Sequence, residues 1–261
     1  MSATLAGSGE IALVARQSVF GAFVLFCRIG GCMMVAPGVS NAQIPAQVRL
    51  LVAVAVTLAL APFLLGAFAL DFEKLDPPAV AKLIMSEALI GVAIGLMGRL
   101  FFSALETVAT ASAQFLGLAN PFGVELDHDQ STAPVASVVT IAAVAILFAS
   151  DFHWEILRGL VGSYRAIPLG SGFEAGFTVR QLVDTLGQSF FVAARVASPF
   201  FIYSLLANFT LALVNRVTPQ ISIFFVAPPF IAGGGVVLFY LVGRNEIGQF
   251  MAAFSDWLSR S

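Results

Sequence analysis

The sequence predicts an all-α membrane protein with several hydrophobic spans. Of its 261 residues, 59% are apolar and 11% are charged, and the mean hydropathy is +0.93. Soluble domains carry roughly twice that charged fraction, so the chain has too little polar surface to cover a water-soluble globule. A helix that crosses a bilayer needs about 20 residues without a charge. Three windows meet this condition: Leu50 to Leu70, Gln130 to Ser150, and Val196 to Asn215.

Three further segments are long enough for a span but are interrupted by proline and glycine or by charged residues: Val217 to Gly243, Gln17 to Ala36 with Arg28, and Leu83 to Ala104 with Glu87 and Arg99. We therefore expect about six hydrophobic helices. The polar connections between them are too short for a second domain, so residues 1–261 are expected to form one domain. With six spans, the side that holds both termini also holds most of the Lys and Arg residues, which favours a cytoplasmic position for it.

The segment from Asp151 to Arg165, DFHWEILRGLVGSYR, differs from the apolar windows on either side of it. It mixes apolar and charged residues at helical spacing. This pattern predicts an amphipathic helix that lies near the membrane interface.

Four prolines lie inside the hydrophobic windows, at Pro62, Pro199, Pro228 and Pro229. A proline removes a backbone donor and disturbs the preceding turn. In hydrocarbon the freed carbonyls need partners, which only protein or a water-filled cavity supplies. A single proline is compatible with an ordinary kinked helix. The last pair precedes three glycines, so the run from Pro228 to Gly235 predicts a real break.

Four charged residues, Arg28, Glu87, Arg99 and Glu106, lie inside apolar segments. Each costs at least about 2.5 kcal/mol at the centre of a bilayer if it faces lipid alone. Two explanations stay open: the side chains face protein or water, or they lie near helix ends and extend to the interface. The stretch from Gly91 to Gly95 has small residues four apart, which allows helices to approach closely. Together these features predict a chain that packs against many other helices.

No arrangement of residues indicates catalysis or cofactor binding. The histidines, His128 and His153, lie in different loops and form neither a zinc-protease motif nor an i, i+4 metal pair. The sequence has no P-loop and no G-x-S-x-G motif, and the acidic run from Glu125 to Asp129 lacks the glycine and the terminal glutamate of a calcium loop. Cys27 and Cys32 would lie on different faces of one helix. No basic stripe suggests nucleic acid as a partner. We predict no catalytic, cofactor or metal site.

Three stretches carry recognisable motifs. Ser40 to Pro62, SNAQIPAQVRLLVAVAVTLALAP, has a "P-x-x-x-R" element before an apolar helix that ends in Ala-Pro; Asp151 to Gly170 reads DFHWEILRGLVGSYRAIPLG, and Asn215 to Phe230 reads NRVTPQISIFFVAPPF. In this order they resemble the FliR family. Ser222 departs from its pattern, where Asn is frequent, and so does Phe152, where Gly is frequent. The matching motif residues are Pro45, Arg49, Pro62, His153, Arg216, Pro219, Gln220, Phe224 and Pro229.

The resemblance implies a component of the flagellar type III export gate, in the bacterial inner membrane at the flagellar basal body. In that family one FliR chain joins several copies of FliP and FliQ in a helical channel for unfolded flagellar subunits, and FlhB binds outside it. FliR is similar to a FliP unit followed by a FliQ-like hairpin. For this chain the resemblance implies a FliP-like part at 1–184 and a FliQ-like hairpin and tail at 185–261. Val196 to Gly243 would be the hairpin, with its turn at Arg216 to Gln220.

The family also has an internal plug that closes the resting channel, and by position it corresponds to QFLGLANP, Gln114 to Pro121. Apolar side chains of this stretch can fill a dewetted constriction, and its glycine and asparagine permit an irregular backbone. A helix that ends in an Asn-Pro turn is the alternative. The plug candidates are Gln114, Phe115, Leu116, Gly117, Leu118, Asn120 and Pro121.

Other classes of protein compete with a flagellar export subunit. The homologous SctT- or SpaR-type subunit of a virulence injectisome shares the fold and differs in the proteins that it exports. The residues from Arg216 to Gln220 favour the flagellar subunit over the injectisome subunit. A small-molecule transporter would have paired interrupted helices in two halves, and the sequence shows no such pair. A membrane enzyme is disfavoured because no nucleophile and base can be named.

Overall fold

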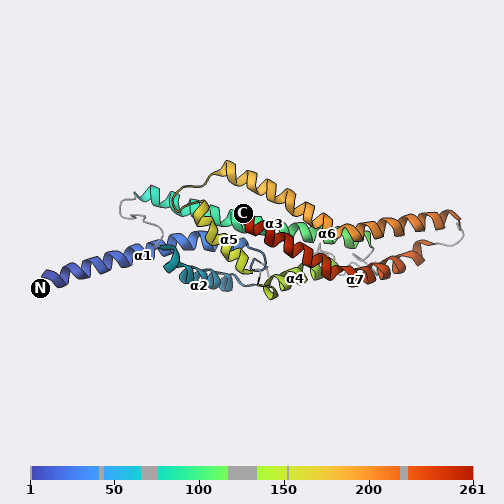
Figure 1. Cartoon of the computed structure of the whole chain (residues 1–261), viewed down its shortest axis with the longest axis horizontal. Helices are drawn as coiled ribbons and strands as arrows, with labels where there is room; N and C mark the ends of the chain where they lie inside the picture. Colours follow the sequence, from blue (N-terminus) through green and yellow to red (C-terminus); the bar gives the residue numbers. More distant parts are fainter. Residues whose placement is uncertain are drawn as a thin grey trace. The chain divides into compact units, whose positions relative to one another are not determined.

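The computed structural model describes residues 2–40, 44–65, 76–116, 134–151, 153–217 and 223–260. These residues form helices and no strand (Figure 1). The all-α prediction is therefore confirmed for the part of the chain that the structure describes. The helices are α1 (Ser2–Val35), α2 (Ala46–Leu65), α3 (Pro77–Phe115), α4 (Pro134–Ala149), α5 (His153–Ala166), α6 (Ala175–Val217) and α7 (Ile223–Arg260).

Five of the described helices are long and apolar enough to cross a membrane: α1 from Arg16, α2, α3, α6, and α7 from Pro229 to Leu258. Helix α4 has only 16 residues, and it passes the same test only when joined with α5 as one broken span. The number of candidate spans is thus 5, or up to 6 with the broken pair. The prediction of about six hydrophobic helices is confirmed.

The predicted break between Pro228 and Gly235 is wrong. Helix α7 continues without interruption from Ile223 to Arg260. A proline removes one hydrogen-bond donor, and an apolar neighbourhood offers the neighbouring backbone groups no better partners than the next helical turn. Gly234 instead allows close packing, because a Cβ atom there would collide with the hydroxyl of Tyr203 from α6.

The chain divides into two compact units. Unit 1 contains residues 1–99 and 157–183, and unit 2 contains residues 100–156 and 184–261. Helices α3, α5 and α6 each contribute residues to both units. Helix α6 continues through positions 184 and 185, so the proposed FliP-like and FliQ-like parts meet inside a helix and that division stays a prediction.

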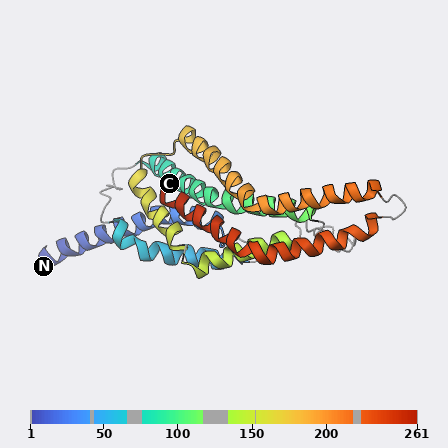
Figure 2. The ribbon, with the colours of Figure 1, turned by 45° about the vertical axis from the view of Figure 1, so that its right-hand side comes forward.

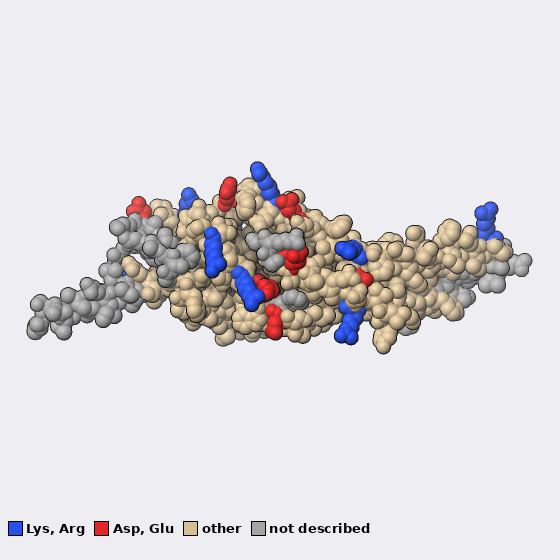
Figure 3. Space-filling view, viewed as in Figure 1, with Lys and Arg blue, Asp and Glu red and all other residues tan. Residues whose placement is uncertain are grey.

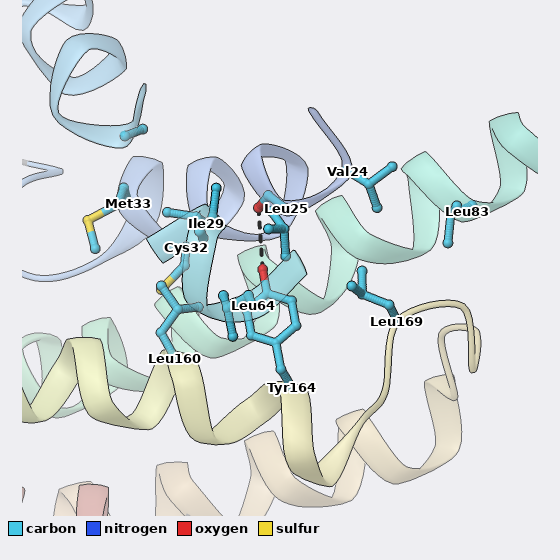
Figure 4. Packing of buried hydrophobic residues seen from close by; sticks show 12 residues of the cluster. Val24, Leu25, Ile29, Cys32, Met33, Leu64, Leu83, Leu160, Tyr164 and Leu169 are labelled. Atoms are coloured by element: carbon cyan, nitrogen blue, oxygen red, sulfur yellow. Dashed lines mark hydrogen bonds between the residues drawn. The ribbon is translucent and has the colours of Figure 1, made fainter. Parts of the chain in front are cut away.

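Unit 1 has a core of aliphatic side chains around one tyrosine. Leu25, Ile29 and Cys32 of α1 are fully buried there, together with Leu160 and Tyr164 of α5. Figure 4 shows the Tyr164 ring among these side chains, with its hydroxyl directed at the carbonyl of Leu25. The core therefore joins segments of α1 and α5 that are far apart in the sequence.

Unit 2 has a core rich in aromatic rings. Phe101 and Phe102 of α3 contact Phe250 and Phe254 of α7 edge to face, with centroid separations of 5.5 to 6.4 Å. Such edge contacts add to the stabilisation from buried area. In the same unit, α7 and the part of α6 from residue 184 lie side by side and antiparallel, as Figure 2 shows.

Large apolar side chains are exposed on both units. In unit 1 Phe63 is 79% exposed, and in unit 2 Leu205 is 71% and Tyr240 84% exposed. Charged side chains are few and scattered on the face shown in Figure 3. Exposed apolar surface of this extent needs lipid or protein to cover it.

Candidate gate and assembly residues

Helices α1 and α3 touch backbone to backbone in unit 1. A Cβ atom at Gly91 would collide with the carbonyl oxygen of Arg28, and one at Gly95 would lie 2.5 Å from the carbonyl oxygen of Cys32. From the other side, a Cβ atom at Gly31 would lie 2.7 Å from the carbonyl oxygen of Ala88. The close approach predicted from Gly91 and Gly95 is confirmed, and the contact consists of small residues as membrane helix pairs favour.

Glu87 lies four residues before Gly91 and therefore shares its face of α3. Its carboxylate oxygen Oε2 accepts a hydrogen bond from Nε of Arg28 over 2.6 Å, and both side chains are 0% exposed. The other carboxylate oxygen, Oε1, accepts from the backbone N–H of Gly170 over 3.4 Å. The close helix contact thus places the two opposite charges within reach of each other in a dry interior.

The guanidinium of Arg28 also binds the end of α5. Its Nη1 donates to the carbonyl oxygens of Ile167, at 3.0 Å, and Ser163, at 3.3 Å. The ring of Tyr164 lies below the guanidinium, with its centroid 4.2 Å away, as in other cation–π pairs. One terminal nitrogen, Nη2, is buried without a hydrogen-bond partner in the described ranges.

The four internal charges have different surroundings. Arg28 and Glu87 face protein, which decides between the two explanations for this pair. Arg99 is exposed and Glu106 is half-buried. Sequence reasoning singled out both members of the pair but not Tyr164, Ser163 or Gly170, since only the fold brings α5 to them.

The "P-x-x-x-R" element forms the start of α2. The backbone N–H of Arg49 donates to the carbonyl of Pro45 over 3.3 Å. The guanidinium of Arg49 folds back, so that Nε and Nη2 donate to the carbonyl of Ile44 at 3.1 and 2.9 Å. The motif therefore forms a local hydrogen-bonded structure that sets the backbone conformation just before and in the first turn of α2. Pro62, near the other end of α2, is exposed inside an uninterrupted helix.

His153 is the first residue of α5 in unit 2, so the prediction that it lies in a loop is wrong. Its ring stacks on Phe148 of α4 with centroids 5.6 Å apart, and Nδ1 is buried without a hydrogen-bond partner in the described part of the chain. Asp151 before it has a φ of 59°, and its carbonyl accepts from the N–H of Trp154 over 3.0 Å. The ring therefore helps to hold the corner between α4 and α5 through stacking.

Helix α3 ends where the plug candidates begin. Gln114 and Phe115 are exposed, and the ring of Phe115 lies 5.5 Å from that of Phe201. Leu116 is 3% exposed and contacts α7, because a Cβ atom at Gly235 would lie 3.2 Å from its side chain. The remaining plug candidates, Gly117, Leu118, Asn120 and Pro121, lie outside the described residues.

Unit 2 has a partly open cavity of about 250 Å³. Its walls come from α3, α4, α6 and α7, and nearly all of the lining side chains are apolar. Ser112 lines it, but its hydroxyl donates to the carbonyl of Val108 over 2.8 Å. Glu246 lines it as a half-buried carboxylate. The cavity can hold apolar groups and offers no paired acid and base.

The hairpin motif is only partly described. Arg216 is exposed in the last turn of α6, where a cation favours the helix dipole, and Pro229 is exposed in α7. Phe224 belongs to α7, but its side chain lies outside the described ones. Of the turn expected at Arg216 to Gln220, Arg216 and Val217 are instead the last residues of α6, and residues 218–220 lie outside the described ones. Pro219, Gln220, Ser222 and Phe152 also lie outside the described residues.

Among the described residues, no three His, Cys, Asp or Glu side chains form a group that could hold a metal ion. The acidic residues Glu125, Asp127 and Asp129, and also His128, lie outside those ranges. The described sites are thus built from apolar contacts, backbone capping and one buried ion pair.

These features define a polytopic helical membrane protein whose helices pack closely and whose apolar surface extends beyond its own core. The sequence profile of the bacterial export proteins, family 1, matches residues 19–257. The chain belongs to this family.

The chain is also similar in sequence to individual proteins of flagellar and injectisome export systems. The chain is 29% identical over 211 residues to the flagellar biosynthetic protein FliR of Caulobacter vibrioides, an alignment that covers 81% of this chain and 83% of the relative. It is 24% identical over 215 residues to the protein of the same name from Escherichia coli, covering 81% and 79%. It is 29% identical over 162 residues to the Yop proteins translocation protein T of Yersinia pestis, covering 60% and 61%.

Proposed function

We propose that this chain is the FliR-type subunit of a flagellar type III export apparatus in the bacterial inner membrane, at the flagellar basal body. One copy joins several FliP and FliQ homologues to form the channel through which unfolded flagellar proteins are exported, and an FlhB homologue binds outside. The observation that carries this proposal is the family match over residues 19–257, joined to flagellar relatives aligned over 81% of the chain.

The surface of the chain supports a role inside an assembly. Phe63, Leu205 and Tyr240 are large side chains that are each more than two thirds exposed. Helices α6 and α7 also form an antiparallel pair, as a FliQ-like hairpin requires. Part of this apolar surface would be covered by neighbouring subunits rather than by lipid.

Gentle purification of the tagged chain from its native membranes tests the assembly. We expect FliP-like and FliQ-like chains to co-purify in a complex of fixed composition. A lone chain under conditions that preserve other membrane complexes of the same cells would contradict the proposal.

The end of α3 is proposed to begin the plug. Deletion of Gln114 to Pro121 is expected to raise ion leak through the assembled gate, since it removes the apolar groups that would close the channel. Phe191→Ala is the control, because it removes an exposed apolar side chain outside the plug candidates. Unchanged permeability in the deletion, or an equal leak in the control, would contradict a plug here.

A virulence injectisome subunit is the second candidate, since the similarity to the Yop proteins translocation protein T reaches 29% identity. Complementation separates the two. The chain is expected to restore motility to a strain that lacks its flagellar FliR, whereas restored secretion by an injectisome strain without restored motility would favour the second candidate.

A further inference from the structure

Eight residues, Ile167 to Glu174, join α5 to α6 within unit 1, and we call them the α5–α6 connection. The first half of the connection is bound to the core of unit 1, and the second half is exposed. Leu169 is buried, whereas Ser171 and Glu174 are exposed. Gly170, with a φ of 85°, makes the turn between the halves. The contacts of Ile167 to Gly170 therefore determine the point at which the connection leaves the core.

Two of the contacts that hold this half come from the buried ion pair. Nη1 of Arg28 donates to the carbonyl of Ile167 over 3.0 Å, and Oε1 of Glu87 accepts from the N–H of Gly170 over 3.4 Å. One partner belongs to α1 and the other to α3. The pair thus binds the connection from two helices at once, and each charge orients the other through the 2.6 Å contact.

The position of the pair also suits the end of α5. The last carbonyls of a helix have no partner within it, and a cation there is favoured by the helix dipole. Arg28 supplies that cation from another helix and reaches the carbonyls of Ser163 and Ile167. Burying two charges contributes little net stability compared with apolar residues of similar size, but it can specify one arrangement.

We propose that Arg28 and Glu87 form a latch, a conformational device that sets the position of the α5–α6 connection against α1 and α3. The latch is separate from what holds the two helices together, because their backbone contact rests on Gly91 and Gly95. Opening the latch releases the connection while α1 and α3 stay packed. This inference goes beyond the proposed export function and does not depend on it.

Hydrogen exchange of the full-length chain in lipid nanodiscs tests the latch. The main variant is the double substitution Arg28→Met with Glu87→Leu, which replaces the charges by apolar groups of comparable size. We expect the amide of Gly170 to exchange about tenfold faster or more, because its N–H loses a charge-assisted partner. The amides of Ile167, Leu169 and Ser171 should also exchange faster, because the connection is released from the core. The amides of α1 and α3 should keep the exchange rates of the unsubstituted chain. Arg99→Gln, which removes an exposed charge from α3, is the matched control and should change neither region.

A second variant covers the case in which the double variant does not fold. Arg28→Lys keeps the charge and its attraction to Glu87, but one ammonium group cannot match the fork geometry of a guanidinium. We expect faster exchange in the connection alone. Unchanged exchange from Ile167 to Ser171 in the folded variant would overturn the latch. Equal acceleration across α1, α3 and the connection would overturn it too, since the pair would then act as a general stabiliser.

Discussion

Unit 1 and unit 2 hold their helices together by different means. In unit 1, α1 and α3 meet at glycines, and the contact encloses an ion pair whose two side chains are 0% exposed. In unit 2, Phe101 and Phe102 pack edge to face on α7, and the same unit has a partly open cavity of about 250 Å³. The first arrangement depends on exact distances between polar atoms, whereas the second depends on apolar area.

The two units therefore tolerate different kinds of substitution. A close backbone contact has no space for an extra methyl group, and a buried charge cannot lose its partner without a large cost. An aromatic core with a cavity loses stability when area is removed but accepts added volume. The four predictions below test this contrast through the free energy of unfolding of the purified full-length chain in micelles.

The largest effect is expected for Glu87→Ala. This substitution leaves the buried Arg28 without its counter-charge, and breaking such a pair costs about 4 kcal/mol. Denaturant titration would measure the loss. Glu246→Ala in unit 2 is the matched control, because Glu246 is only half-buried. Similar losses of unfolding free energy in the two variants would show that the stability of the two units depends on charged side chains to the same extent.

The next effect concerns the aromatic core of unit 2. Phe254→Ala removes a ring that is 0% exposed and contacts Phe101 and Phe102 at 5.5 Å. We expect a loss of about 3 kcal/mol. Phe191→Ala, at a site that is 72% exposed, should change stability by less than about 0.5 kcal/mol. A small loss at Phe254 would mean that the rings do not support this core.

A smaller effect is expected for Gly91→Ala. The added methyl group meets the carbonyl oxygen of Arg28, so α1 must shift away from α3 at a cost of about 2 kcal/mol. The shift of the thermal unfolding midpoint would report it. Gly162→Ala in α5 is the control with open space around the new methyl group, and it should raise stability by about 0.5 to 1 kcal/mol. A neutral Gly91→Ala would contradict the close helix contact.

The smallest effect compares one substitution in both units. Ala109→Leu extends a side chain into the cavity of unit 2 and is expected to stabilise the chain by about 1 kcal/mol. Ala53→Leu places the same group at a site that is 0% exposed in unit 1, where overpacking destabilises. A raised thermal unfolding midpoint for Ala109→Leu and a lowered one for Ala53→Leu would support the contrast between the units. Shifts of the midpoint in the same direction would contradict it.

Hydropathy and residue spacing were sufficient to predict the helical class, the approximate number of spans and a close helix contact at Gly91 and Gly95. Span lengths follow from bilayer thickness, and small residues four apart follow from helix geometry. Helix ends were less well predicted. The window from Val196 to Asn215 is the second half of α6, which begins at Ala175, because a charge such as Arg195 ends a hydropathy window without ending a helix.

The candidate site was predictable only in part. The charges of Arg28 and Glu87 stood out against their apolar surroundings, but their pairing spans 59 positions and depends on the fold. The break expected at Pro228 to Gly235 failed because proline and glycine patterns report local preference. The contact of Gly234 with Tyr203 of α6 is tertiary, and no local pattern contains it.

The separation of Arg28 from Glu87 has a consequence for how the chain is made. Synthesis delivers Arg28 to the membrane 59 residues before its counter-charge. Until α3 follows, α1 carries an unpaired cation that costs at least about 2.5 kcal/mol at mid-bilayer. It is therefore energetically favourable for α1 to reach its final depth in the membrane only after α3 has been synthesised.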